Sequence, residues 1–217
     1  MKKFAIFDLD GTLLDTIDDL FLAINEMLVT CGYPEISREK IRTCIGHGAR
    51  VFVQKAIEPI PADDAEADRC LEIYRQIYDR DGTSHARVFA GMKEALAELK
   101  ARGVRLAVYS NKPDFATRHA IAQYFGDTFE IVYGAREGIP VKPDPAGALA
   151  ILDEWGADPA DAAFVGDGDT DFLTAKAAGM KPVSVLWGYR TREELSACGA
   201  TVFAETPEQM KNFILED

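Results

Sequence analysis

The feature that most constrains the fold is an alternation of short, uninterrupted apolar runs with longer segments of helical periodicity. Strands that are apolar on both faces and separated by helices are typical of a parallel sheet covered on both sides. We therefore predict an α/β fold with a three-layer core. The expected strands are residues 4–7, 106–109, 131–132, 162–165 and 183–186, and the expected helices lie around 91–102, 113–124, 144–155 and 170–178.

Residues 16–82 interrupt this alternation. Apolar residues recur at helical spacing from Ile17 to Leu28, and no convincing strand follows before residue 83. We predict that this segment is a small helical domain inserted after the first strand. Residues 1–15 and 83–217 would then form the core domain together.

The charge balance limits the partners. The chain has 36 acidic and 24 basic residues, a net charge of −12, so it repels nucleic-acid backbones and we expect no nucleic-acid partner.

The N-terminal apolar run stops at Asp8, which is too short for a signal peptide, and no later run reaches membrane-spanning length. Four scattered cysteines form no Cys-x-x-Cys pair, which argues against zinc and favours a reducing compartment. We expect a cytoplasmic protein without a membrane partner, either a monomer or a homodimer.

Polar residues cluster where the predicted strands end. The first strand runs into Asp8 and Asp10, whose side chains point the same way in an extended segment, and Gly11 permits a sharp turn. In parallel α/β sheets, ligands bind beyond the carboxyl ends of the strands. We therefore expect one crevice to collect these aspartates together with Ser110-Asn111-Lys112, Lys142 and Gly166-Asp167-Gly168-Asp169-Thr170-Asp171.

Carboxylates that lie side by side repel one another unless a cation neutralises them. Oxygen ligands of this kind suit a hard ion such as Mg²⁺, which often binds a substrate phosphate as well. Together with Lys142, Mg²⁺ would make the acidic crevice an acceptor for a phosphate dianion. A calcium EF-hand is excluded, because neither acidic run has Gly at its sixth position or Glu at its twelfth.

The order of these motifs resembles that of the haloacid dehalogenase (HAD) superfamily over residues 4–180. Any one of the motifs is weak, but four of them in order, each at a strand end or helix start, are specific. The resemblance implies a Rossmann-like core with a helical cap domain. Gly168 departs from the family, which more often has Ser there. The motifs are Asp8-Leu9-Asp10-Gly11-Thr12-Leu13, Ser110-Asn111, Lys142 and Gly166-Asp167-x-x-x-Asp171.

The resemblance also implies roles for these residues. Asp8 would be the nucleophile that forms an aspartyl-phosphate, and Asp10 would protonate the leaving group and then activate water. Ser110 would donate a hydrogen bond to a phosphate oxygen, and Lys142 would pair with the phosphate and with Asp8. Magnesium would bind the Asp8 carboxylate, the main-chain carbonyl of Asp10 and the Asp167 carboxylate.

Asp171 is expected to orient Lys142 or a metal-bound water, and Thr12 and Asn111 are candidate substrate contacts. Each of these residue types also has an ordinary structural use. Ser and Asn are common in turns after strands, and an acidic side chain is favoured at a helix N-terminus. Only the order of the motifs favours the functional interpretation.

Within the superfamily the chain most resembles phosphoglycolate phosphatases. The segment Ile45-Gly46-His47-Gly48-Ala49-Arg50 is similar to the glycine-containing cap segment of that family. Gly46, His47 and Arg50 are therefore candidates for lining the substrate mouth, with Arg50 meeting a substrate carboxylate. An ordinary loop between two helices is the alternative.

The leading hypothesis is Mg²⁺-dependent hydrolysis of a small phosphomonoester such as 2-phosphoglycolate. A sugar phosphomutase similar to β-phosphoglucomutase needs the same two aspartates, Asp8 and Asp10, and stays an alternative. A non-catalytic binding protein on the same fold is another alternative, which the intact motifs disfavour. Hydrolysis of a carbon–halogen bond is also disfavoured, because it releases no alkoxide that Asp10 would have to protonate.

Overall fold

The computed structural model describes residues 1–58, 63–82 and 84–216. The chain folds into two compact units. Unit 1 consists of Met1–Asp15 and Val88–Asp217, and unit 2 is the intervening Thr16–Arg87. Within these described ranges, no helix is both long enough and apolar enough to cross a membrane.

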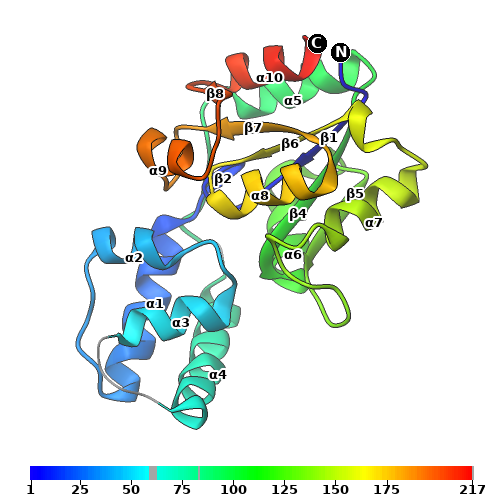
Figure 1. Cartoon of the computed structure of the whole chain (residues 1–217). Helices are drawn as coiled ribbons and strands as arrows, with labels where there is room; N and C mark the ends of the chain where they lie inside the picture. Colours follow the sequence, from blue (N-terminus) through cyan, green and yellow to red (C-terminus); the bar gives the residue numbers. More distant parts are fainter. Residues whose placement is uncertain (59–62, 83, 217) are drawn as a thin grey trace. The chain divides into compact units, whose positions relative to one another are not determined.

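Unit 1 is built on a six-stranded parallel sheet with the order β5-β4-β1-β6-β7-β8 (Figure 1). The central strand β1 pairs with β4 on one side and with β6 on the other, so the carboxyl ends of these three strands are neighbours. The predicted α/β fold with a Rossmann-like sheet is confirmed. The strands are β1 (Phe4–Phe7), β4 (Arg105–Pro113), β5 (Ile131–Ala135), β6 (Ala162–Gly166), β7 (Lys181–Val185) and β8 (Phe203–Ala204).

Helices bury both faces of the sheet, which is why its strands are apolar without interruption. Ala5 and Phe7 of β1 belong to an apolar cluster with residues of α5, α6 and α10, whereas Ile6 belongs to a second cluster with residues of α7 and α8. A fully buried side chain as large as Phe7 or Ile6 contributes about 1.5–3 kcal/mol to stability. These helices are α5 (Met92–Ala101), α6 (Asp114–Phe125), α7 (Ala146–Trp155), α8 (Asp169–Ala178) and α10 (Pro207–Leu215).

The chain also contains short elements that the apolar pattern did not predict, among them helix α9 in the C-terminal part of unit 1. Helix α9 begins at a capping box in which the Thr191 hydroxyl and the Glu194 carboxylate each accept the other residue's main-chain N–H. Strands β2 and β3 form a separate two-stranded sheet. The remaining elements are α9 (Arg192–Ala197), the 3-10 turn η1 (Pro159–Asp161), β2 (Leu14–Asp15) and β3 (Arg87–Val88).

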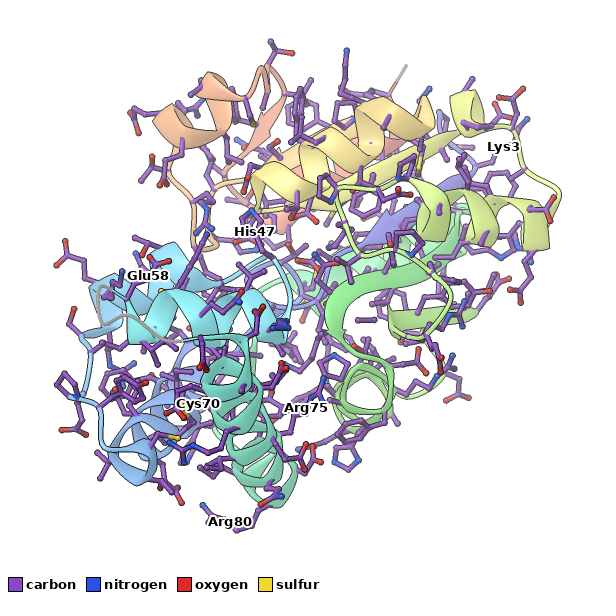
Figure 2. All side chains as sticks on the ribbon, turned by 60° about the horizontal axis from the view of Figure 1, so that its bottom comes forward. Lys3, His47, Glu58, Cys70, Arg75 and Arg80 are labelled. Atoms are coloured by element: carbon purple, nitrogen blue, oxygen red, sulfur yellow. The ribbon has the colours of Figure 1, made fainter. Side chains whose placement is uncertain are left out.

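Unit 2 is helical, with no strand inside the described residues 16–58 and 63–82. Helices α1 and α4 pack against each other. Arg80 of α4, labelled in Figure 2, binds the Glu26 carboxylate of α1 through its guanidinium, at 3.1 and 2.8 Å. The acidic start of α4 has a local cause, since Asp63 accepts the N–H of Glu66 as the N-cap. The helices are α1 (Ile17–Cys31), α2 (Arg38–Cys44), α3 (Ala49–Ile57) and α4 (Asp64–Asp81).

The return from the helical unit lies at Val88, a few residues later than the predicted position 83. The residues shortly before Val88 still contact helix α1 of unit 2. The main-chain N–H of His85 donates to Asp19 Oδ1 at 2.8 Å. This contact depends on a side chain far away in sequence, so hydrophobic periodicity does not reveal it.

Candidate active site

Three neighbouring strands deliver the polar residues of the candidate site. Asp8 directly follows β1, and its main-chain N–H still donates to the Val165 carbonyl of β6 at 2.9 Å. The backbone of Asp8 is therefore held by the sheet itself. Asp167 follows the last residue of β6, and the end of β4 carries Ser110. The sheet order brings these strand ends together, as the sequence predicted.

A tight turn follows Asp8. The Leu9 carbonyl accepts the N–H groups of Leu13 and Leu14, both at 3.0 Å, and Gly11 has a positive φ of 84°. A Cβ atom at Gly11 would lie 2.5 Å from Asp167 Oδ2. Glycine is thus required at this position for two reasons: the backbone has a positive φ, and the Asp167 carboxylate lies too close for a Cβ atom.

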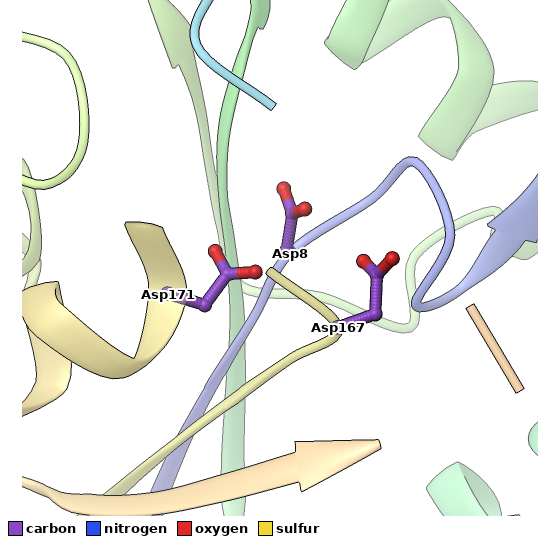
Figure 3. Close-up of side chains that lie close together, drawn as sticks. All are labelled: Asp8, Asp167 and Asp171. Carbon is purple, nitrogen blue, oxygen red and sulfur yellow. The ribbon is translucent and has the colours of Figure 1, made fainter. Parts of the chain in front are cut away.

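Asp8, Asp167 and Asp171 form a carboxylate cluster (Figure 3). Each offers one oxygen, and these oxygens lie within 4.8 Å of one another. Burial raises the pKa of Asp8 to about 6, and the neighbouring Asp171 charge adds to this against the opposing effect of Lys142. Burial, with the charges of Asp171 and Asp8, raises the pKa of Asp167 to about 7. The ionised carboxylates are therefore disfavoured when no cation accompanies them.

Lys142 supplies the positive charge at one side of this cluster. Its side chain is buried, with Nζ 2.7 Å from Asp8 Oδ1 and 2.6 Å from Asp171 Oδ1. Burial lowers the pKa of Lys142, but the two carboxylates outweigh it, and the pKa is raised overall. The ammonium also lies 5.7 Å from the ring centre of Tyr109 and 5.6 Å from that of Phe164. Lys142 is therefore fixed in place and charged.

Both oxygens of Asp171 are used inside the protein. Oδ1 binds Lys142, and Oδ2 accepts the main-chain N–H of Gly168 at 2.9 Å, at the start of α8. A carboxylate at a helix N-terminus is stabilised by the helix dipole. This arrangement suits the predicted role of Asp171 in orienting Lys142.

Asp167 is held by two donors. The Thr12 hydroxyl donates to Oδ1 at 3.1 Å, and the main-chain N–H of Tyr189 donates to Oδ2 at 2.7 Å. A Cβ atom at Gly188 would lie 2.5 Å from Asp167 Cγ, so the loop after β7 packs directly on this carboxylate. Thr12 is fully buried and positions Asp167, and the substrate contact predicted for Thr12 stays a prediction.

Asn111 joins two parts of the site. Its amide nitrogen donates to the Lys142 carbonyl at 2.9 Å, and its amide oxygen accepts the Lys142 main-chain N–H at 2.8 Å. These bonds hold the segment that carries Lys142 against the end of β4. The neighbouring Ser110 hydroxyl is buried and accepts the N–H of Lys112 at 3.3 Å. The substrate contacts predicted for Ser110 and Asn111 stay predictions.

Asp10 has a partner that the sequence did not identify. The Lys112 ammonium lies 2.9 Å from Asp10 Oδ1 and 3.1 Å from Oδ2. The Lys112 side chain is only 3% exposed and that of Asp10 only 14%. The sequence signal was the position of Lys112 at a strand end, beside Ser110-Asn111, but nothing in the spacing showed that the lysine faces Asp10.

The candidates in the helical unit lie between α2 and α3 and at the start of α3. Gly46 has a positive φ of 108°. His47, which is labelled in Figure 2, is half-buried. The Arg50 guanidinium is held within the unit by Asp64 at 2.9 Å and Asp68 at 3.1 Å. The contacts with substrate predicted for these three residues stay predictions.

The donor set at the strand ends fits a hard divalent cation. Asp8 and Asp167 offer buried carboxylate oxygens, and burial raises the pKa of both, so a cation bound between them would favour their ionised forms. Lys142 faces Asp8 from the side of Asp171, so the lysine neutralises only part of the cluster. Oxygen ligands without nitrogen or sulfur suit hard divalent cations rather than zinc.

Comparison with known proteins gives consistent matches. Residues 5–185 match the family model described as haloacid dehalogenase-like hydrolase. Phosphoglycolate phosphatase 1 of Pseudomonas aeruginosa is 36% identical over 194 residues, which cover 87% of this chain and 71% of the relative. Phosphoglycolate phosphatase of Vibrio parahaemolyticus is 31% identical, covering 96% of this chain and 94% of the relative. The crystal structure of a predicted phosphoglycolate phosphatase from Haemophilus somnus has a TM-score of 0.90 at 27% identity, covering 98% and 97% of the two chains.

Proposed function

Since this chain belongs to the haloacid dehalogenase-like hydrolases and is a phosphatase of that family, we propose that it hydrolyses a small phosphomonoester through an aspartyl-phosphate on Asp8. The observation that carries the proposal is the contact of Asp8 Oδ1 with the buried Lys142 ammonium at 2.7 Å. This contact places a carboxylate and a fixed positive charge at one strand end, where a phosphate can meet both. The names of the relatives support 2-phosphoglycolate as the substrate.

In the first step an oxygen of Asp8 attacks phosphorus, and the bond between phosphorus and the ester oxygen breaks. The bonding electrons stay on the ester oxygen, which takes a proton from Asp10 and leaves as an alcohol. Lys142 balances the negative charge of the phosphoryl oxygens during the transfer. The aspartyl-phosphate divides one difficult reaction into two easier ones.

In the second step a water molecule attacks the phosphorus of the aspartyl-phosphate. Asp10, now ionised, takes the proton of this water, and the bond between phosphorus and Asp8 breaks. Inorganic phosphate leaves, and Asp8 returns as a carboxylate. The contact of Asp10 with Lys112 at 2.9 and 3.1 Å fixes the position of the Asp10 side chain.

Asp8 and Asp167 of the carboxylate cluster would hold a Mg²⁺ ion, together with the main-chain carbonyl of Asp10. When bound, it would supply positive charge to the transferring phosphoryl group. Thr12 and the Tyr189 N–H keep Asp167 in position for this role. The cytoplasmic location expected from the sequence stays part of the proposal.

The test is release of inorganic phosphate from a panel of small phosphorylated metabolites, with Mg²⁺ and with EDTA. We expect phosphate release that EDTA abolishes, and 2-phosphoglycolate among the good substrates. An isomerised sugar phosphate in place of free phosphate would instead identify a mutase.

Asp8→Asn is the decisive variant, because asparagine keeps the shape of the side chain but cannot form the aspartyl-phosphate. We expect activity to fall below about one part in 10⁴, the scale of loss when a nucleophile is removed. Because Asp8→Asn also removes one of the two anionic partners of Lys142, thermal melting must first show that the variant is folded. A folded Asp8→Asn protein that turns over at an appreciable rate would contradict the nucleophile assignment.

A further inference from the structure

Lys112 is placed beside the proposed leaving-group acid by an irregularity of β4. Tyr109 of β4 pairs with Tyr133 of β5, and the next paired residues are Pro113 and Ala135. Between these two pairs the chain advances four positions along β4 but only two along β5. The extra residues of β4 therefore form a bulge. Bulges re-aim side chains and are frequent next to active sites. The bulge contains Lys112, whose ammonium meets Asp10.

The environment of Lys112 is unusual for a lysine. Its side chain is almost entirely buried, and its ammonium contacts both oxygens of the Asp10 carboxylate. Taking an ammonium out of water is costly unless anions compensate it. The protein therefore maintains a second buried positive charge beside Asp10, the proposed leaving-group acid, in addition to Lys142.

We propose that Lys112 binds a carboxylate of the substrate, carried on the carbon next to the ester oxygen. This inference rests on the proposed function and narrows its substrate class to phosphate esters of short 2-hydroxy acids. In this arrangement Lys142 binds the phosphate of the substrate, and Lys112 binds its carboxylate.

The distances agree with this assignment. An Asp10 oxygen that donates a proton to the ester oxygen lies about 2.7 Å from it. Lys112 Nζ lies 2.9 and 3.1 Å from the two Asp10 oxygens, so the ester oxygen is within about 6 Å of Nζ whichever oxygen is used. A carboxylate one carbon further along the leaving group extends about 3 Å beyond the ester oxygen, within hydrogen-bond reach of the ammonium. An ammonium has three N–H donors without a fixed plane, so it can share its charge between two carboxylates.

The main-chain segments that carry the two lysines are tied together. Asn111 precedes Lys112 in the chain and bonds both the N–H and the carbonyl of Lys142, at 2.8 and 2.9 Å. Two anions joined through one ester linkage match such a pair of fixed cations. Arg50, the other candidate for a substrate carboxylate, is bound by Asp64 and Asp68 within the helical unit.

The first experiment uses the unaltered protein with Mg²⁺ and three substrates. These are 2-phosphoglycolate, 2-hydroxyethyl phosphate, which has a neutral group in place of the carboxylate, and 3-phosphooxypropanoate, whose carboxylate is one carbon further away. We expect kcat/KM for 2-phosphoglycolate to exceed that for each of the other two roughly 10- to 100-fold, the factor that one hydrogen bond between charged groups provides. Equal values for the charged and neutral esters, or a preference for the longer acid, would overturn the proposal even without a variant.

The second experiment compares Lys112→Met, which keeps the length of the side chain without its charge, with Arg50→Ala. Each variant is first checked by thermal melting, and Lys112→Gln replaces Lys112→Met if the latter does not fold. The readout is the ratio of kcat/KM for 2-phosphoglycolate to that for 2-hydroxyethyl phosphate. We expect Lys112→Met to lower this ratio at least tenfold, through KM, and more than Arg50→Ala does.

The alternative role for Lys112 is to position Asp10 alone. In that case Lys112→Met would lower kcat on both substrates by the same factor and leave the ratio unchanged, which would overturn the proposal. A fall in the ratio confined to Arg50→Ala would also overturn it and assign the carboxylate to the helical unit. If the unaltered protein releases phosphate from none of the esters, the proposed function itself fails, which is a distinguishable result.

Discussion

Replacing Gly188 with alanine tests whether the position of Asp167 sets the affinity for the divalent cation. An added Cβ at Gly188 would lie 2.5 Å from Asp167 Cγ, whereas ordinary contacts between carbon atoms are about 3.5 Å. The Asp167 side chain must therefore move by about 1 Å. Metal ligands have to lie within about 0.2 Å of their normal distances, so a shift of this size removes a carboxylate from the coordination sphere.

We expect the affinity for Mg²⁺ to be tenfold to hundredfold weaker, which corresponds to a loss of about 1.4–2.8 kcal/mol in binding free energy. Two measurements report it: the Mg²⁺ concentration that gives half-maximal phosphate release, and the rise in melting temperature when Mg²⁺ is added to the protein without substrate. The second measurement does not depend on catalysis, so it separates metal binding from chemistry.

Gly168→Ala is the matched control on the other side of Asp167. Its Cβ would lie 3.2 Å from Asp171 Oδ2, so a shift of a few tenths of an ångström accommodates it. Neither Gly168 nor Gly188 has a positive φ, so both substitutions share the usual effect of Gly→Ala on the unfolded chain. If Gly188→Ala keeps its Mg²⁺ half-saturation within twofold of the unaltered protein, the inferred link between this loop and the metal is wrong.

Other predictions concern the carboxylate cluster. The pKa values of Asp8 and Asp167 are raised from 3.8 to about 6 and about 7, so the folded, metal-free protein binds more protons than the unfolded chain in this range. Its free energy of unfolding should fall as the pH rises from about 4 to about 7, by up to about 1.4 kcal/mol per pH unit for each group. Urea unfolding in EDTA measures this, and an unchanged slope in Asp167→Asn would contradict it. Asp171→Asn should cost roughly 1–3 kcal/mol, because Lys142 loses one of its two anionic partners at 2.6 Å, and should lower kcat more than it raises KM. An unaltered urea midpoint and kcat would remove Asp171 from this role.

The sequence was sufficient to predict the fold class, because a strand that is buried on both faces is a continuous run of apolar residues. Ala5 and Phe7 face one layer of helices and Ile6 the other, so no polar residue is tolerated between them. The strand ends were equally visible, since a parallel sheet places the residues after its strands at one edge. Asp8, Asp167 and Lys142 therefore came together in the structure from positions far apart in the chain.

Contacts made by main-chain atoms were not readable in the same way. Tyr189 holds Asp167 through its N–H, which every residue except proline possesses, so its side chain carries no signal. Gly188 is needed because an Asp167 side chain packs on it, and only the folded loop brings the two into contact. Both lie after β7, outside the motifs that carried the family resemblance.

What the sequence determined by itself was the set of chemical groups and the edge of the sheet where they gather, because periodicity and chain order are local properties. What only the tertiary structure decided was which of these groups touch. The bulge in β4 turns Lys112 toward Asp10, and the bonds of Asn111 fix Lys142 beside Asp8 and Asp171. Such pairings depend on distances of a few ångströms between segments that are far apart in the chain. Asp10 and Lys112, for example, are about a hundred residues apart. Their spacing along the chain does not predict that they touch.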